Sequence, residues 1–159
     1  EQREDKKMSK DPLEILRKEH EEVLKVLDNL EKDIKNKNTE IAEKDINVLE
    51  KEFEKHSLNK EEKVLFLEIE KFMPRDGGPT GVMIMEHEDL VNSIKNFKGV
   101  LKAKDFDKIS ETGTHIIELL RQHIDKENNI LFMMADMHLD DKQKKIIVEK
   151  YKKIDEKYK

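Results

Sequence analysis

Apolar residues recur along this chain at steps of three and four, and each of four such series contains one histidine. The series are Leu16, His20, Val23, Leu27, Leu30, Ile34; Leu49, Phe53, His56, Val64, Leu67; Met83, His87, Leu90, Ile94, Phe97, Leu101; and Ile109, Thr112, Ile116, Leu120, His123, Glu127, Ile130, Met134. Steps of three and four place residues on one side of an α-helix. The pattern therefore predicts four amphipathic helices that turn their apolar sides, histidines included, toward a shared core.

Residues that start or break helices divide the chain at matching places. Asp11, Pro12 and Glu14 are typical of a helix start, with a capping residue, a proline in the first turn and an acidic third position. The stretch PRDGGPTG at 74–81 is the strongest break, because proline and glycine interrupt regular structure. We expect the four helices at about 11–35, 40–73, 81–102 and 106–136.

Short connections between long helices favour an antiparallel up-down-up-down four-helix bundle, so the predicted fold class is all-α. We expect residues 1–10 to be a flexible polar leader and residues 11–138 to form the bundle. Asp140 and Gln143 can begin a further helix within 139–159, which we place outside the bundle because it is short and basic on its outer faces. Some methionines are expected to fill the core, namely Met83, Met85, Met133 and Met134.

Composition narrows the possible functions. Charged residues make up 43% of the chain and hydrophobic residues 35%, which suits slender amphipathic helices. The net charge of −5 arises from intermixed signs without a basic stripe, so no nucleic-acid partner is expected. The absence of cysteine excludes disulfides and thiolate-held metals. No apolar run approaches the length of a membrane span, and we expect a cytoplasmic protein with no membrane partner.

Acidic residues close to the histidines point to a metal site. Glu127 follows His123 by four residues, on the same side of the helix, and Glu61 follows His56 by five. Burying an ionised carboxylate costs several kcal/mol unless a charge partner or metal compensates it. Without a metal, such carboxylates are expected to protonate or draw in water. The predicted metal ligands are His20, His56, Glu61, His87, His123 and Glu127.

The donor types suit more than one metal, and some neighbours compete with the predicted ligands. Imidazole suits iron, copper, zinc and nickel, and carboxylates can bridge two ions. Shared between two ions, six ligands leave positions open for a small exogenous ligand. Glu62 is a rival to Glu61, whereas His115 lies about 80° around the helix from His123 and is expected at the surface. His138 is expected to pack or cap the last helix.

At these residues the chain resembles the hemerythrin-like, or HHE, family over most of 11–136. The matching marks are Glu19-His20; His56 with Lys60-Glu61-Glu62 and Leu65-Phe66; Gly78-Pro79 before Glu86-His87; and LRQHIDKE at 120–127 with Leu131-Phe132. The resemblance implies a cofactor of two iron ions bridged by carboxylates and an oxo or hydroxo group. It also implies binding of dioxygen or a related diatomic or anionic ligand, such as nitric oxide or peroxide, for sensing, storage or redox chemistry.

Two features depart from the family pattern. Family members commonly have His-x-x-x-Glu on the second helix, whereas one more residue separates His56 from Glu61. Oxygen-carrying hemerythrins have His-x-x-x-His on the third helix, where Met83 and Val91 flank His87 in this chain. The missing imidazole disfavours simple oxygen carriage. Alternatives are a di-iron oxidase- or peroxidase-like enzyme, an iron donor for cluster repair, and a structural or regulatory bundle with a different metal.

The segments 56–66 and 122–132 also resemble each other when they are aligned on their Leu-Phe pairs. Similar segments on the second and fourth helices predict two pseudo-symmetric halves around a shared site.

Overall fold

The first and last helices begin at the predicted capping residues, Asp11 and Asp140. A computed structural model describes residues 10–159, so the expected leader lies, apart from Lys10, outside the described residues. The Asp11 side chain accepts a hydrogen bond from the Leu13 N–H at 3.0 Å, and proline occupies the first turn of the helix. At the last helix, Asp140 and Gln143 form a complete capping box in which each side chain accepts the other residue's backbone N–H.

Helices account for nearly the whole described chain. The elements are α2 (Pro12–Lys35), α3 (Thr39–Phe53), η1 (Glu54–Leu65), α4 (Phe66–Ile69), α5 (Pro79–Ala103), α6 (Phe106–Lys126), η2 (Glu127–Leu131), α7 (Phe132–His138) and α8 (Asp141–Lys157). The two η elements are π-helical, and each joins its neighbours into one continuous helix. Residues 10–159 contain no strand, which confirms the all-α prediction.

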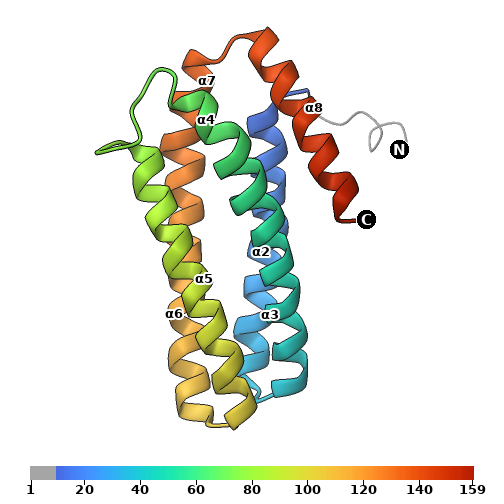
Figure 1. Ribbon diagram of the computed structural model, residues 1–159. Helices are drawn as coiled ribbons and strands as arrows, with labels where there is room; N and C mark the ends of the chain where they lie inside the picture. The colour runs from blue at the N-terminus through green and yellow to red at the C-terminus, as the bar shows by residue number, and fades with distance from the viewer. Residues whose placement is uncertain (1–9) are drawn as a thin grey trace.

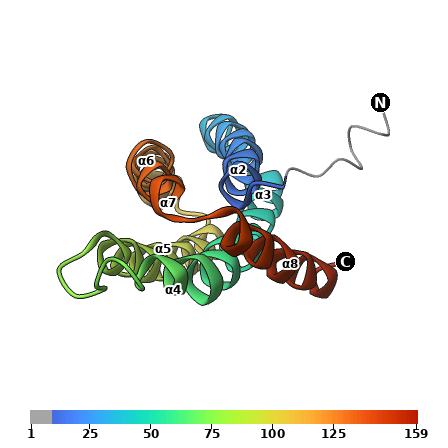
Figure 2. The same ribbon diagram turned by 90° about the horizontal axis from the view of Figure 1, so that it is seen from above.

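The long helices lie side by side along one axis in two hairpins. Figure 1 shows consecutive rods running in opposite directions: α2, then α3 to α4, then α5, then α6 to α7. The first hairpin is α2 with α3–η1–α4, and the second is α5 with α6–η2–α7. Helix α2 also packs against α6, and α3 against α5. Helix α8 lies outside these rods against η1 and α2, as Figure 2 shows from above.

A tight connection at 70–78 links the two hairpins. Gly77 adopts a left-handed conformation, with φ of 74°, which is strained for residues with a side chain. A side chain at Gly78 would collide with the carbonyl oxygen of Pro74. These glycines therefore permit the sharp turn that ends one hairpin and begins the next.

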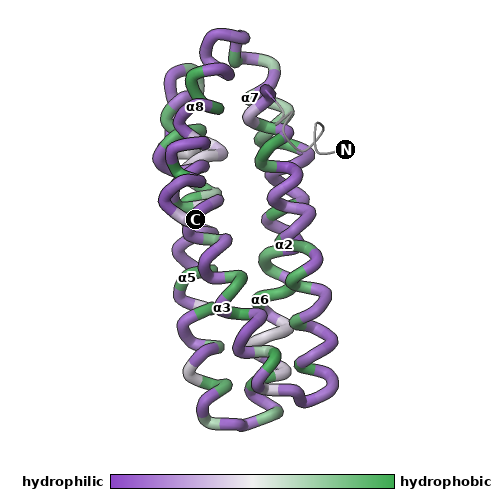
Figure 3. Tube along the Cα trace, turned by 90° about the vertical axis from the view of Figure 1, so that its right-hand side faces the viewer, coloured by the Kyte–Doolittle hydropathy of each residue, from purple (hydrophilic) through white to green (hydrophobic). Residues whose placement is uncertain are grey.

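The apolar core is divided into two clusters. One fills the end of the bundle built from α3, the second half of α2, the second half of α5 and most of α6. The other fills the opposite end and includes Leu16, Phe66, Phe132, Ile147 and Tyr151. Figure 3 shows hydrophobic residues recurring along otherwise hydrophilic helices. Within residues 10–159, no helix is both long and apolar enough to cross a bilayer.

Several predicted core positions are wrong, and the π-helical segments explain two of them. Leu67 and Ile130 are exposed, whereas their neighbours Phe66 and Leu131 are buried. A π-turn bonds residue i to i+5 and so takes one more residue than an α-turn, which rotates the following side chains around the helix. Two of the methionines expected in the core, Met85 and Met133, are exposed as well.

The surroundings of Gly113 and Gly99 predict opposite effects of alanine substitution on stability. An added Cβ at Gly113 would press on Ile34 and on the Phe97 ring, so Gly113→Ala should destabilise the fold by about 1–3 kcal/mol. Gly99 has nothing within 4 Å of such a Cβ, and Gly99→Ala should stabilise its helix by up to about 1 kcal/mol. Urea unfolding of both variants measures the difference, and equal shifts would contradict the packing described.

Candidate metal centre

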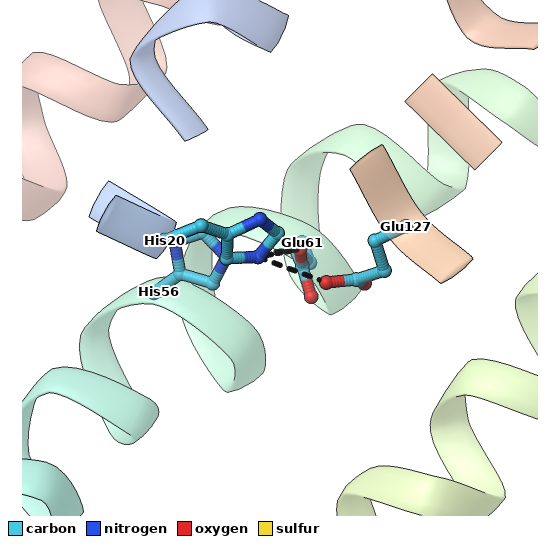
Figure 4. A group of neighbouring side chains, drawn as sticks. All are labelled: His20, His56, Glu61 and Glu127. Carbon is cyan, nitrogen blue, oxygen red and sulfur yellow. Dashed lines mark hydrogen bonds and ion pairs between the residues drawn. The ribbon is translucent and has the colours of Figure 1, made fainter. Parts of the chain in front are cut away.

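The structure brings all six predicted ligands together between the two apolar clusters. Each is exposed by 3% or less. Their ligand atoms form two groups, in each of which all atoms lie within 4.8 Å of one another: His20, His56, Glu61 and Glu127; and Glu61, His87, His123 and Glu127. Figure 4 shows the first group converging from three helices. Both groups contain both carboxylates.

Glu61 lies between the two histidine pairs. The Nε2 atoms of His20 and His56 are 3.0 Å apart, and those of His87 and His123 are 3.2 Å apart. One carboxylate oxygen of Glu61 lies 3.0 Å from His56 Nε2, and its other oxygen lies 3.2 Å from His87 Nε2. Glu61 is therefore placed to give one oxygen to each group.

Glu127 reaches across the hairpins in the same way. Its Oε1 atom lies 3.1 Å from His20 Nε2 and 3.4 Å from His123 Nε2. Neither contact has the geometry of a hydrogen bond, and both oxygens of this carboxylate lack a hydrogen-bond partner among the described residues. Carboxylate oxygens carry lone pairs only, so their burial without donors suits ligation of a cation.

An outer partner holds each histidine so that its Nε2 atom faces the centre. The four Nδ1 atoms donate to Asn128 Oδ1 from His20 at 2.8 Å, to Glu19 from His56 at 2.8 Å, to Glu62 from His87 at 2.6 Å, and to Glu86 from His123 at 2.7 Å. Such partners fix the tautomer and the ring orientation of metal-ligating histidines. Four imidazole nitrogens and the oxygens of two carboxylates therefore fit a pair of metal cations.

Aromatic rings fix two of these imidazoles from the apolar side. The His20 ring stacks on Phe132 with centroids 5.4 Å apart, and the His87 ring stacks on Phe66 at 5.9 Å. Phe53 meets the His87 ring edge-on at 5.4 Å. Packing thus limits ring rotation where the hydrogen bonds alone would leave some freedom.

In the metal-free site Glu127 stays charged, so the expected protonation does not apply to this carboxylate. Burial disfavours the imidazolium, but the carboxylates of Glu61 and Glu19 outweigh it and raise the pKa of His56 to about 10. Against the same burial, Glu127 and Glu86 raise the pKa of His123 to about 10. Although burial favours a neutral Glu127, the imidazoles of His123 and His20 hold its pKa well below the usual value. His56 and His123 therefore hold protons in the metal-free site.

An internal repeat accounts for the spacing of His56 and Glu61. Glu19-His20 and Glu86-His87 are equivalent, and so are His56 and His123, each at an offset of 67 residues. Past these histidines the offset falls to 66, because Lys60-Glu61 matches Lys126-Glu127. The first hairpin thus has one additional residue, which the long π-helical segment η1 accommodates. As a result Glu61 points inward and its rival Glu62 holds His87 from outside.

The remaining histidines lie apart from the centre. His115 is exposed and belongs to neither ligand group, in agreement with its expected surface position. His138 ends α7, where its ring stacks on Phe72 with centroids 4.2 Å apart and its Nδ1 donates to the Met134 carbonyl. The outer partners Glu19 and Glu86 were missed, although each directly precedes a predicted ligand.

Helix α8 contacts the residues that hold His56 in the first hairpin from outside. The fully buried Lys60 ammonium pairs with Glu19 and, at 2.7 Å, with Asp155 of α8. It also lies 5.5 Å from the centre of the Tyr151 ring. Because Glu19 holds His56, α8 is joined to a candidate ligand through a chain of side chains. The sequence predicted the place of α8 but not this connection.

A match to a known protein family agrees with this geometry. Residues 11–135 match the profile of the family described as "Hemerythrin HHE cation binding domain". The chain therefore belongs to the hemerythrin HHE cation-binding domain family, whose members bind metal cations, usually iron. A search of curated proteins finds no match. The buried histidine and glutamate groups are compatible with the metal binding of this family.

The one-residue difference between the hairpins predicts unequal effects of two deletions. Deleting Asn59 gives His56 and Glu61 the four-residue spacing of His123 and Glu127, so η1 should become α-helical and metal binding should persist. Deleting Asp125 should rotate Glu127 by about 100° relative to His123 and abolish binding. Cobalt(II) titration followed by visible absorption, with circular dichroism as the folding control, tests both. Loss of binding in a well-folded Asn59 deletion would contradict the register described.

Proton and metal binding compete at the histidines, which predicts how stability depends on pH. The pKa values of His56 and His123 rise from 6.5 to about 10 on folding, so their stabilisation is complete below pH 6.5 and is lost toward pH 10. The lowered pKa of Glu127 stabilises the fold above pH 4.5 and loses this effect on acidification. Metal-free protein should therefore melt at lower temperature as the pH rises above 6.5.

Metal should reverse this trend, because it binds deprotonated imidazole. The difference in melting temperature between metal-loaded and chelator-treated protein should widen from pH 6 to pH 8. Thermal melts followed by circular dichroism measure both curves. A difference that stays constant over this range would show that the titrating histidines do not hold the metal.

Proposed function

We propose that this protein is a non-haem di-iron protein that binds a small diatomic or anionic ligand for sensing, storage or redox chemistry. The observation that carries the proposal is that two groups of four ligands share both carboxylates, Glu61 and Glu127. Sharing of this kind suits two neighbouring cations, which lie roughly 3.5–4 Å apart in binuclear centres. His20 and His56 would hold one ion, and His87 and His123 the other.

The donor set and the family together favour iron. Imidazole nitrogen with carboxylate oxygen suits iron, and the family's cation is usually iron. Bound iron would supply one-electron redox chemistry and coordination positions for an exogenous ligand. The chain itself contributes the rest: the outer partners orient the imidazoles, and the apolar clusters on both sides exclude bulk water.

A small cavity beside the histidines offers room for the exogenous ligand. Its volume is about 10 Å³, enough for one water-sized molecule. Its lining is mostly apolar and comprises His20, Val23, Leu49, Glu52, Phe53, His56, Ser57, Leu120, His123 and Ile124. Three candidate ligands, His20, His56 and His123, line this cavity, so its position supports binding of a small exogenous ligand such as dioxygen or nitric oxide.

Metal analysis tests the proposal directly. Protein loaded with iron(II) under anaerobic conditions should hold about two irons per chain. His56→Ala should lower this stoichiometry, whereas His115→Ala, which changes an exposed histidine outside both groups, should leave it unchanged. Equal iron content in the two variants, or one iron per chain in the parent protein, would refute the di-iron proposal.

The place of Met83 predicts how ligand binding can be tuned. Met83 is buried one helical turn before His87 in the cluster next to the centre. Met83→His would restore the two-histidine spacing of oxygen-carrying hemerythrins on α5. The added imidazole should occupy a coordination position and weaken azide binding by about tenfold or more, which corresponds to about 1.4 kcal/mol. Azide titration of the oxidised protein followed by optical absorption measures the change, and Met85→His, at an exposed position, is the matched control.

Unchanged azide affinity in Met83→His would mean that this position does not reach the metals. Equal weakening of azide binding in Met83→His and Met85→His would show that the effect does not come from ligation by residue 83.

A further inference from the structure

The internal repeat relates the two hairpins to each other, but helix α8 covers only the first of them. Helix α8 packs against α2 and η1 of the first hairpin. Its apolar residues Ile147, Val148 and Tyr151 are buried there, and its Asp155 pairs with Lys60. Figure 2 shows α8 on this side of the bundle only, and no helix of the described chain lies along the equivalent side of α5 and η2.

Equivalent residues of the two hairpins differ in exposure accordingly. Ile15 is 8% exposed and Val64 7%, but their counterparts are exposed by 48% at Val82 and 56% at Ile130. The same holds for the lysines beside the carboxylate ligands: the Lys60 side chain is fully buried, and the side chain of its counterpart Lys126 is 43% exposed. Positions that are buried on the α8 side of the bundle are therefore open to solvent on the opposite side.

Further apolar residues extend this surface, which we call the α5/η2 face and define by Val82, Met85, Lys126, Ile130 and Met133. Met85 is 71% exposed and Met133 55%. Val82 and Met85 lie one helical turn apart on α5, and Ile130 and Met133 lie one turn apart across η2 and α7. Exposed apolar residues grouped in this way mark an interaction site more often than isolated ones do. The ion pair of Lys126 with Glu86 connects α6 to α5 across the face.

The charged residues of the α5/η2 face also resemble those on the side of the bundle that α8 covers. Lys60 pairs with two acids, Glu19 from its own hairpin and Asp155 from α8. Lys126 pairs with Glu86, the counterpart of Glu19, and among residues 10–159 no second acid stands in the place of Asp155. The face thus combines exposed apolar side chains with a cation that can accept one more carboxylate.

We propose that the α5/η2 face binds an amphipathic helix of a partner protein whose contact residues resemble those of α8. The helix would carry two adjacent apolar residues, an aromatic residue in the next turn and an acidic residue one turn further, as Ile147, Val148, Tyr151 and Asp155 do in α8. Its acidic residue pairs with Lys126, and its apolar residues cover Val82 and Ile130. The chain's own α8 cannot serve, because it is already packed against the first hairpin.

This surface lies over Lys126 and Glu86, which hold His123 from outside. A bound helix would therefore cover Lys126 and Glu86, as α8 covers their counterparts Lys60 and Glu19. The proposal concerns a surface and does not depend on which metal the centre holds.

A peptide with the sequence of residues 140–159 is the probe. A lactam between the exposed positions 145 and 149, one turn apart, keeps the peptide helical without touching its apolar side. Fluorescence anisotropy of the labelled peptide with the full chain should show saturable one-to-one binding. Ile130→Asp and Val82→Asp, both at exposed positions, should each weaken binding at least about tenfold.

Three controls make the result specific. Val48→Asp alters an equally exposed apolar residue on α3 and should leave the affinity within about twofold of the parent value. A peptide with Asp155→Asn should bind more weakly to the parent chain, because it lacks the charge that pairs with Lys126. Melting temperatures of the protein variants verify that they fold.

Two outcomes would overturn the proposal. One is an absence of peptide binding, or equal binding to the parent chain and to Ile130→Asp. The other is self-association of the full chain that Ile130→Asp abolishes, since the occupant of the face would then be a second copy. Sedimentation of the parent chain and of Ile130→Asp distinguishes that case.

Discussion

Two carboxylates without exposed surface, Glu61 and Glu127, constrain the rest of this structure. A buried negative charge is unfavourable unless positive charge or metal lies close to it. Four imidazoles meet this need, as cations or as co-ligands of a metal, and three of them are held in turn by a second carboxylate. The resulting polar layer separates two apolar clusters, and both must pack well because the layer itself contributes little apolar burial.

The π-helical segments follow from the same constraint. Segment η1 contains Glu61 and η2 begins at Glu127. At each glutamate the helix must direct a carboxylate to the centre and then return its apolar side to the core. One π-turn shifts the positions of the following side chains by one residue, at the cost of less favourable backbone hydrogen bonds. In the first hairpin this shift also absorbs an additional residue, so that Glu61 and Glu127 arrive at the same place from unequal spacings.

Much of this could be predicted from the sequence, because an α-helical period of about 3.6 residues links each histidine to its apolar face. The capping residues Asp11 and Asp140 also fixed where helices begin. The sequence could not identify the wider turns, since a shift of one residue leaves apolar positions on either side equally regular; Leu67 and Ile130 were misplaced for this reason. The contact of Asp155 with Lys60 was hidden as well, because acids and lysines are abundant and only the packing of α8 selects one pair.

The tight connection at 70–78 has a consequence for how the molecule could be divided. Each histidine pair comes from a single hairpin, His20 with His56 and His87 with His123, whereas each ligand group takes a carboxylate from the other hairpin. A chain cut within this connection would give two fragments, each with its own imidazoles and one glutamate. Cations at the centre would then link separate polypeptides, in addition to the apolar contacts of α2 with α6 and of α3 with α5. Metal binding would then strengthen the association of the two fragments. The measured association constant of the fragments would depend on the metal, as in a metal-dependent fragment-complementation pair.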